Sequence, residues 1–175
     1  FLTEECVTEM KEHGVWLVPT LAAVKNILKG YDDGDRSIPD YVIEKARRVF
    51  DRHIASIKMY YSAGGRIAMG TDAGTPHNRH GENARELEYM CEIGISARDS
   101  LFFSTASAAD LMRLGDHGRI KEGNIADLVL CDGDALADIK RAARKENHRM
   151  VVKRGIVARD NRSAFAAGTA RVAAE

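Results

Sequence analysis

The sequence predicts an α/β fold that contains a parallel sheet, and three observations lead to this prediction. Two short apolar segments, residues 15–21 and 66–72, have the composition of strands buried on both faces. A long amphipathic segment, residues 40–62, lies between them, and further helical segments follow the second one. Alternation of buried strands with amphipathic helices is typical of βα units.

Helix signals surround both predicted strands. Thr3 is a plausible N-cap for a helix over residues 3–13, which ends at a His-Gly pair. Residues 40–62 repeat apolar side chains every three or four positions, and Asp40 is placed to cap this second helix. The polar run at 30–37 lacks the spacing of a calcium loop and is predicted to be a solvated loop.

Three further helices are predicted after the second strand. Asn83 and Glu86 have the spacing of a capping box and are expected to open the first. Ser96 and Asp99 are expected to cap the second, and an alanine-rich run at 105–114 forms the third.

The character of the chain changes after residue 115. Glycines recur from there on, and short β-branched runs lie between them at 126–131, 150–153 and 156–158. The pattern predicts a small β module over residues 116–160, followed by an alanine-rich tail at 161–175.

Composition excludes several classes of function. The chain of 175 residues carries 26 Lys plus Arg and 26 Asp plus Glu, so it has no net charge with which to attract nucleic acid. No run reaches the length of a membrane-spanning helix. Cys6, Cys91 and Cys131 form no CxxC pair and are expected to be reduced thiols, which favours a cytoplasmic location.

The most informative position is Asp72, at the carboxyl end of the second predicted strand. In α/β barrels this edge carries the active site, and a carboxylate there is costly to bury unless it is paired or binds a metal. The alternative is that Asp72 only caps the turn that follows. His77 and His80 lie in the next loop, where they could contact substrate or, with Asp72, hold a metal of their own.

Several motifs together make the chain resemble the C-terminal half of an amidohydrolase-superfamily enzyme. The similarity is to the imidazolonepropionase-like and prolidase-like (Xaa-Pro and Xaa-Arg dipeptidase-like) metal-dependent hydrolases. The motifs are GVWLVPT at 14–20, GTDAGTP at 70–76, HGEN at 80–83, ELE at 86–88, ASAA at 106–109, GNIADLV at 123–129 and DGDALADI at 132–139.

The resemblance implies a (β/α)8 TIM barrel with a small β-sandwich. Residues 15–21 and 66–72 would be the seventh and eighth strands, and residues 1–115 the C-terminal portion of the barrel. Residues 116–160 would then form part of a composite β-sandwich. A missing N-terminal half would supply the other strands, and association into a homo-oligomer is expected.

The resemblance also implies a chemistry. Asp72 matches the family's metal-ligating aspartate, which also takes a proton from the attacking water and passes it to the leaving amine. One or two divalent metals, zinc by preference, would polarise an amide of a dipeptide or an N-acyl amino acid. His80 and Thr75 are the expected substrate-binding residues. The other metal ligands of the family are absent from this chain, so the chain alone is expected to hold no metal tightly and to be inactive.

Two alternatives remain open. One is a cyclic-amide hydrolase of the imidazolonepropionase type, and the other is a non-catalytic fragment that acts only by association, for instance as a complementing half.

Overall fold

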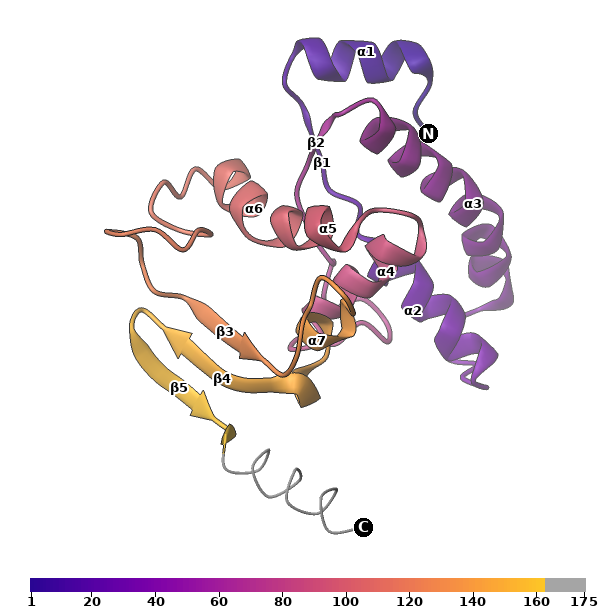
Figure 1. Cartoon of the computed structure of the whole chain (residues 1–175). Coiled ribbons are helices and arrows are strands. Elements are labelled where there is room, and N and C mark those ends of the chain that lie inside the picture. The colour runs from indigo at the N-terminus through magenta and orange to yellow at the C-terminus, as the bar shows by residue number, and fades with distance from the viewer. Residues whose placement is uncertain (163–175) are drawn as a thin grey trace.

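The computed structural model describes residues 1–162, and its elements are labelled in Figure 1. The first half comprises α1 (Glu4–Glu12), β1 (Trp16–Leu17), α2 (Leu21–Asp32), α3 (Asp40–Ser62) and β2 (Arg66–Ile67). It is followed by the 3-10 helix η1 (Asn83–Arg85), α4 (Glu86–Glu92), α5 (Ala97–Ser104) and α6 (Ala106–Leu111). The last part comprises β3 (Leu128–Cys131), α7 (Lys140–Ala143), η2 (Lys145–Asn147), β4 (His148–Lys153) and β5 (Ile156–Asp160).

The predicted parallel pairing is confirmed, although its strands are shorter than the apolar runs. β1 and β2 pair in parallel, with Trp16 opposite Arg66 and Leu17 opposite Ile67. The connection between them contains both α2 and α3, and in Figure 1 the two helices lie on one side of the strand pair. The carboxyl ends of β1 and β2 therefore meet at one edge, as a βα arrangement requires.

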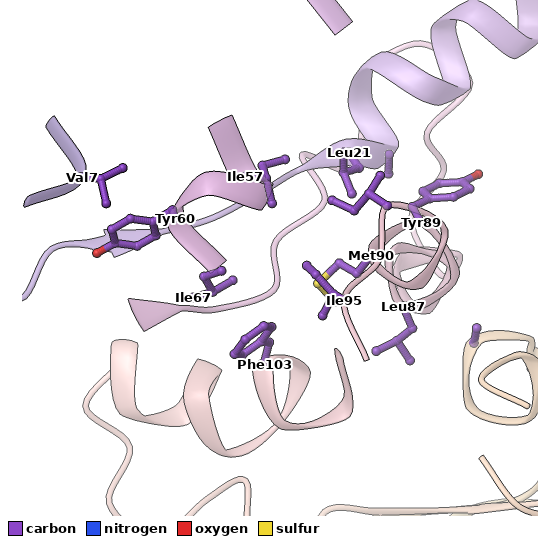
Figure 2. Close-up of a cluster of buried hydrophobic side chains, with 13 residues drawn as sticks. Val7, Leu21, Ile57, Tyr60, Ile67, Leu87, Tyr89, Met90, Ile95 and Phe103 are labelled. Carbon is purple, nitrogen blue, oxygen red and sulfur yellow. The ribbon is translucent and has the colours of Figure 1, made fainter. Parts of the chain in front are cut away.

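One continuous core fixes this edge. Its buried side chains come from α1, β2, α2–α5, the turn between α4 and α5, and α7, and Figure 2 shows them around the strand pair. Tyr60 and Tyr89 contribute their rings to this core, and their hydroxyls point away from it in Figure 2. Each hydroxyl reaches a polar partner: that of Tyr60 donates to the carbonyl of Val15 at 2.6 Å, and that of Tyr89 to Oδ1 of Asn26 at 2.7 Å. Buried hydroxyls that find acceptors avoid the cost of desolvation.

Most helix predictions are confirmed, and some cap predictions are too. The Thr3 side chain accepts from the amide of Cys6, and the Ser96 side chain accepts from the amide of Asp99 at 3.0 Å. Asp40, in contrast, does not cap α3: Pro39 holds the N-cap position, and an Asp40 carboxylate oxygen accepts from the hydroxyl of Tyr31.

The clearest error concerns residues 21–32. The sequence predicts a strand that ends at Leu21 and a solvated loop that includes residues 30–32, whereas all of these residues belong to α2. The helix begins immediately after Thr20, whose own side chain makes no capping hydrogen bond. The ordinary local signal for a helix start is therefore missing at this position.

The predicted β module forms a three-stranded antiparallel sheet in the order β3-β4-β5. Arg154 and Gly155, both at positive φ, make the tight turn between β4 and β5. This sheet lies to one side of the helices in Figure 1, and its strands expose apolar side chains such as Leu130 and Ile156. Its membership of a composite sandwich stays a prediction. No helix within residues 1–162 has the length and apolar character needed to cross a membrane.

Candidate active site

Asp72 follows the carboxyl end of β2, five residues beyond Ile67, on the side where the carboxyl end of β1 also lies. Its side chain is exposed, while Thr71 before it is buried. Its backbone is left-handed, with φ of 50°, a conformation that costs a residue with a Cβ about 1–2 kcal/mol. Gly70 sits so close to the Val18 side chain that a Cβ on it would overlap. The small residue at position 70 therefore lets the two strand ends approach each other.

The loop after Asp72 is closed by hydrogen bonds of its own. The amide and the hydroxyl of Thr75 both donate to the carbonyl of Asp72, at 3.2 and 3.0 Å. The amide of Asn78 donates to the carbonyl of Thr75 at 2.9 Å, and the amide of Gly74 donates to the carbonyl of Asn78 at 2.8 Å. These bonds hold the strained turn in one shape and leave the Asp72 carboxylate free to face outward.

The two residues predicted to bind substrate both lie in this loop. The Thr75 hydroxyl is used by the turn itself, since it also accepts from the Asn78 side chain at 3.3 Å. The imidazole of His80 is exposed and lies over Gly74, because a Cβ on that glycine would be 3.4 Å from Nε2 of His80. His80 is thus placed beside the turn that carries Asp72. Its contact with substrate stays a prediction.

His77 turns away from Asp72 and lies against α2. Its ring occupies the space above Gly30, where a Cβ would overlap it, and its Nε2 is 2.9 Å from a carboxylate oxygen of Asp35. The structure therefore does not bring Asp72, His77 and His80 together. The alternative that these three residues form a metal site is wrong. Within residues 1–162, no group of three or more His, Cys, Asp or Glu side chains is arranged to hold a metal ion.

Glu86 is the buried acid of this region. The predicted capping box with Asn83 is wrong, because Glu86 binds elsewhere. It is the first residue of α4, and its carboxylate reaches across to α2. Oε1 accepts from the amide of Leu21 and Oε2 from the amide of Ala22, each at 2.7 Å. Glu86 therefore caps a helix 65 residues before it in the chain.

The environment of Glu86 perturbs its acidity. Burial raises the pKa of its carboxyl from 4.5 to about 7, and the charge of Asp72 adds to this increase. The two amide donors and the charge of Lys25 lower the pKa but do not offset burial. In turn, burial lowers the pKa of the Lys25 ammonium. The charge of Asp72, which follows β2, thus acts on the carboxyl of Glu86 at the start of α2, which follows β1.

Asn83, the other half of the predicted capping box, serves the loop before α4. Its Oδ1 accepts from the amide of Gly81 at 3.2 Å, within the 3-10 helix region that precedes Glu86. Sequence spacing alone could not separate this local turn from a helix cap.

A separate cleft of about 430 Å³ lies among α2, α3, α4 and α7. Leu28, Phe50 and Tyr89 supply apolar lining, and Lys25 is paired there with Glu92. Asp72 does not line this cleft, so the concave surface and the exposed strand-end carboxylate are different places.

A carboxylate beyond the carboxyl end of a parallel strand, beside a glycine-containing turn, lies where α/β proteins carry their active sites. The chain matches the amidohydrolase family over residues 3–157, and it belongs to that family.

Curated relatives and solved structures resemble this chain over part of their length. The chain is 33% identical over 100 residues to an uncharacterized protein of Mycobacterium tuberculosis, covering 57% of this chain and 26% of that protein. It is 27% identical over 145 residues to ochratoxinase of Aspergillus niger, covering 80% of this chain and 28% of the enzyme.

Two structures are similar in fold as well as in sequence. A prolidase complexed with N-methylphosphonate-L-proline superposes with a TM-score of 0.81 at 27% identity, covering 91% of this chain and 38% of the prolidase. A Xaa-Pro dipeptidase with methionine bound in its active site gives a TM-score of 0.78 at 33% identity, covering 90% and 37%. The chain thus spans well under half the length of the proteins it matches.

Proposed function

We propose that the complete gene product hydrolyses the amide bond of a dipeptide or an N-acyl amino acid, and that Asp72 acts in the reaction. The observation that carries this proposal is the exposed Asp72 carboxylate in the segment that follows β2, in a chain of the amidohydrolase family. The prolidase and Xaa-Pro dipeptidase among its structural neighbours support a short peptide as the substrate.

Asp72 fits a metal site as one ligand of several. Its carboxylate is a hard oxygen donor that faces outward, whereas residues 1–162 offer no complete ligand group. A divalent metal, zinc by preference, would supply Lewis acidity toward the scissile carbonyl. Asp72 would be one ligand of that metal, and its carboxylate would accept a proton from the attacking water and release it to the leaving amine.

His80 and Thr75 are proposed to contact the substrate from the loop after β2. His80 lies over Gly74 with an exposed ring, so it can donate a hydrogen bond to a substrate carbonyl or carboxylate. Thr75 is half-exposed, and its hydroxyl already serves the turn. A homo-oligomeric state and a cytoplasmic location are further predictions of the same proposal.

The test is an activity profile of the complete gene product. We expect zinc-dependent hydrolysis of Xaa-Pro dipeptides, Xaa-Arg dipeptides or N-acyl amino acids, and a roughly thousandfold lower kcat/KM in D72N. D51N is the matched control, because Asp51 is an exposed acid on the surface of α3 and its loss should leave activity unchanged. Full activity in D72N would contradict the role of Asp72. Hydrolysis of cyclic amides alone would favour the imidazolonepropionase-type alternative, and no hydrolysis at all would favour an association fragment.

A further inference from the structure

Asn78 is a buried polar residue inside the loop that carries Asp72, and its side chain is only 3% exposed. Its amide nitrogen donates to the main-chain carbonyl of Thr71, the residue just before Asp72, and to the hydroxyl of Thr75 at 3.3 Å. Its backbone joins the same loop through Gly74 and Thr75. A single side chain thus brackets the strained turn from both sides.

Asn78 is itself held from outside the loop. Its Oδ1 accepts from Nδ2 of Asn26 on α2 at 3.4 Å, and Oδ1 of Asn26 accepts from the hydroxyl of Tyr89 on α4 at 2.7 Å. Figure 2 shows the Tyr89 ring at the side of the core, with its hydroxyl directed away from the core residues. The three side chains form a relay from α4 through α2 to the carbonyl of Thr71.

The direction of every hydrogen bond in this relay is fixed by its ends. The Thr71 carbonyl can only accept, so the amide nitrogen of Asn78 must face it and the Asn78 oxygen must face Asn26. Asn26 then has to present its nitrogen to Asn78 and its oxygen to Tyr89, whose hydroxyl donates. The relay therefore requires amides, rather than carboxylates, at positions 26 and 78.

We propose that Asn78 is the positioning residue that fixes the conformation of the Asp72 turn. The relay through Asn26 and Tyr89 connects this turn to α2 and α4. The proposal rests on the function proposed for Asp72. Asn78 does not touch the Asp72 carboxylate. It acts by fixing the carbonyl before Asp72 and the hydroxyl that closes the turn after it. Small displacements of a catalytic group are costly, about a hundredfold for an error near 1 Å.

The first test compares N78D with N78A in the complete gene product. N78D keeps the shape of the side chain but places a carboxylate oxygen against the Thr71 carbonyl, so we expect kcat to fall about a hundredfold at neutral pH while KM changes little. Lowering the pH protonates the new acid, which can then donate to Thr71. The ratio of N78D to wild-type kcat should therefore rise as pH falls, and the ratio for N78A should stay flat.

The second test uses the far end of the relay, where one hydroxyl group is removed and the ring is kept. Y89F removes the hydroxyl that donates to Asn26 and also interacts with the Arg85 side chain, and it should lower kcat about fivefold, the value of one hydrogen bond. Y31F is the matched control, because the Tyr31 hydroxyl pairs with Asp40 at the surface, and it should leave kcat unchanged.

Amide hydrogen exchange reads the loop directly and needs no turnover. N78D should speed exchange at Gly74 and Thr75, and Y89F should do so to a smaller degree, while the amides of α3 keep their protection. The proposal is overturned if N78D and Y89F leave loop exchange as in the wild type, or if protection is lost evenly along the chain. Because exchange is independent of activity, a protein that hydrolyses none of the substrates tested would refute the proposed function without deciding the role of Asn78.

Discussion

The segments that follow β1 and β2 each contain a residue in the same backbone conformation but lead into different structures. A left-handed residue that is not glycine follows each strand: Thr20, with φ of 45°, comes after β1, and Asp72, with φ of 50°, comes after β2. After Thr20 the chain enters α2 at once, and the helix start is occupied by the buried carboxylate of Glu86. After Asp72 the chain enters a loop bracketed by Asn78, and the Asp72 carboxylate stays exposed.

The two segments use their acids for different purposes at one edge of the fold: one acid caps a helix and the other is exposed. A helix N-terminus at a strand end is a natural place to bind an anion, but here an internal acid already occupies it. The second strand end leaves its acid without such an internal helix partner and presents it to the surroundings. We infer that the first end supplies rigidity and that the second supplies the reactive group.

The largest expected effect on stability comes from removing the acid that caps α2 after β1. E86A leaves the amides of Leu21 and Ala22 without their acceptor in the core and should lower the free energy of unfolding by roughly 4 kcal/mol. E92A is the control, since the exposed pair of Glu92 with Lys25 is worth about 1 kcal/mol at most. Urea unfolding of the complete gene product measures both, and equal losses would contradict the capping role.

The same residue predicts a pH dependence. The pKa of Glu86 is about 7 in the folded state against an ordinary 4.5, so between these values the folded chain holds a proton that the unfolded chain releases. Stability should therefore fall as pH rises through this window, by roughly 3 kcal/mol.

The comparison with E86Q isolates this effect from other titrating groups. The stability of the wild type minus that of E86Q should decrease between pH 4.5 and 7, and should level off above pH 7. A constant difference across that range would show that Glu86 does not titrate there.

The smallest expected effect on stability comes from replacing the left-handed residue after each strand with glycine. Glycine relieves left-handed strain, so T20G and D72G should each stabilise the protein by up to about 1 kcal/mol after the entropy of the unfolded chain is counted. T20G should keep hydrolysis and D72G should lose it. Thermal unfolding together with the peptide assay checks both, and loss of activity in T20G would place chemistry at both strand ends.

The sequence predicted what local patterns encode. The stripe of α3, the caps at Thr3 and Ser96, and the parallel pairing of two apolar runs all follow from neighbouring residues. It also placed Asp72 at the last residue of the second strand, whereas β2 ends at Ile67 and Asp72 lies in the segment that follows.

What the sequence missed depends on partners far away in the chain. The start of α2 is capped from residue 86, so no local side chain announces it. The apolar spacing of Leu21, Val24 and Leu28 was the one available signal for this helix. Asn78 looked like an ordinary loop residue because its partners, Asn26 and Tyr89, are brought to it only by the fold.

The most direct test of the central claim is metal content, measured by plasma emission on the complete gene product and on D72N. The account predicts one or two equivalents of zinc in the wild type, and in D72N a clear loss of metal together with loss of dipeptide hydrolysis. E86Q, which changes the acid at the other strand end, should keep its metal. A folded D72N protein with full metal content and full hydrolysis would contradict the assignment of the reactive carboxylate to the end of β2.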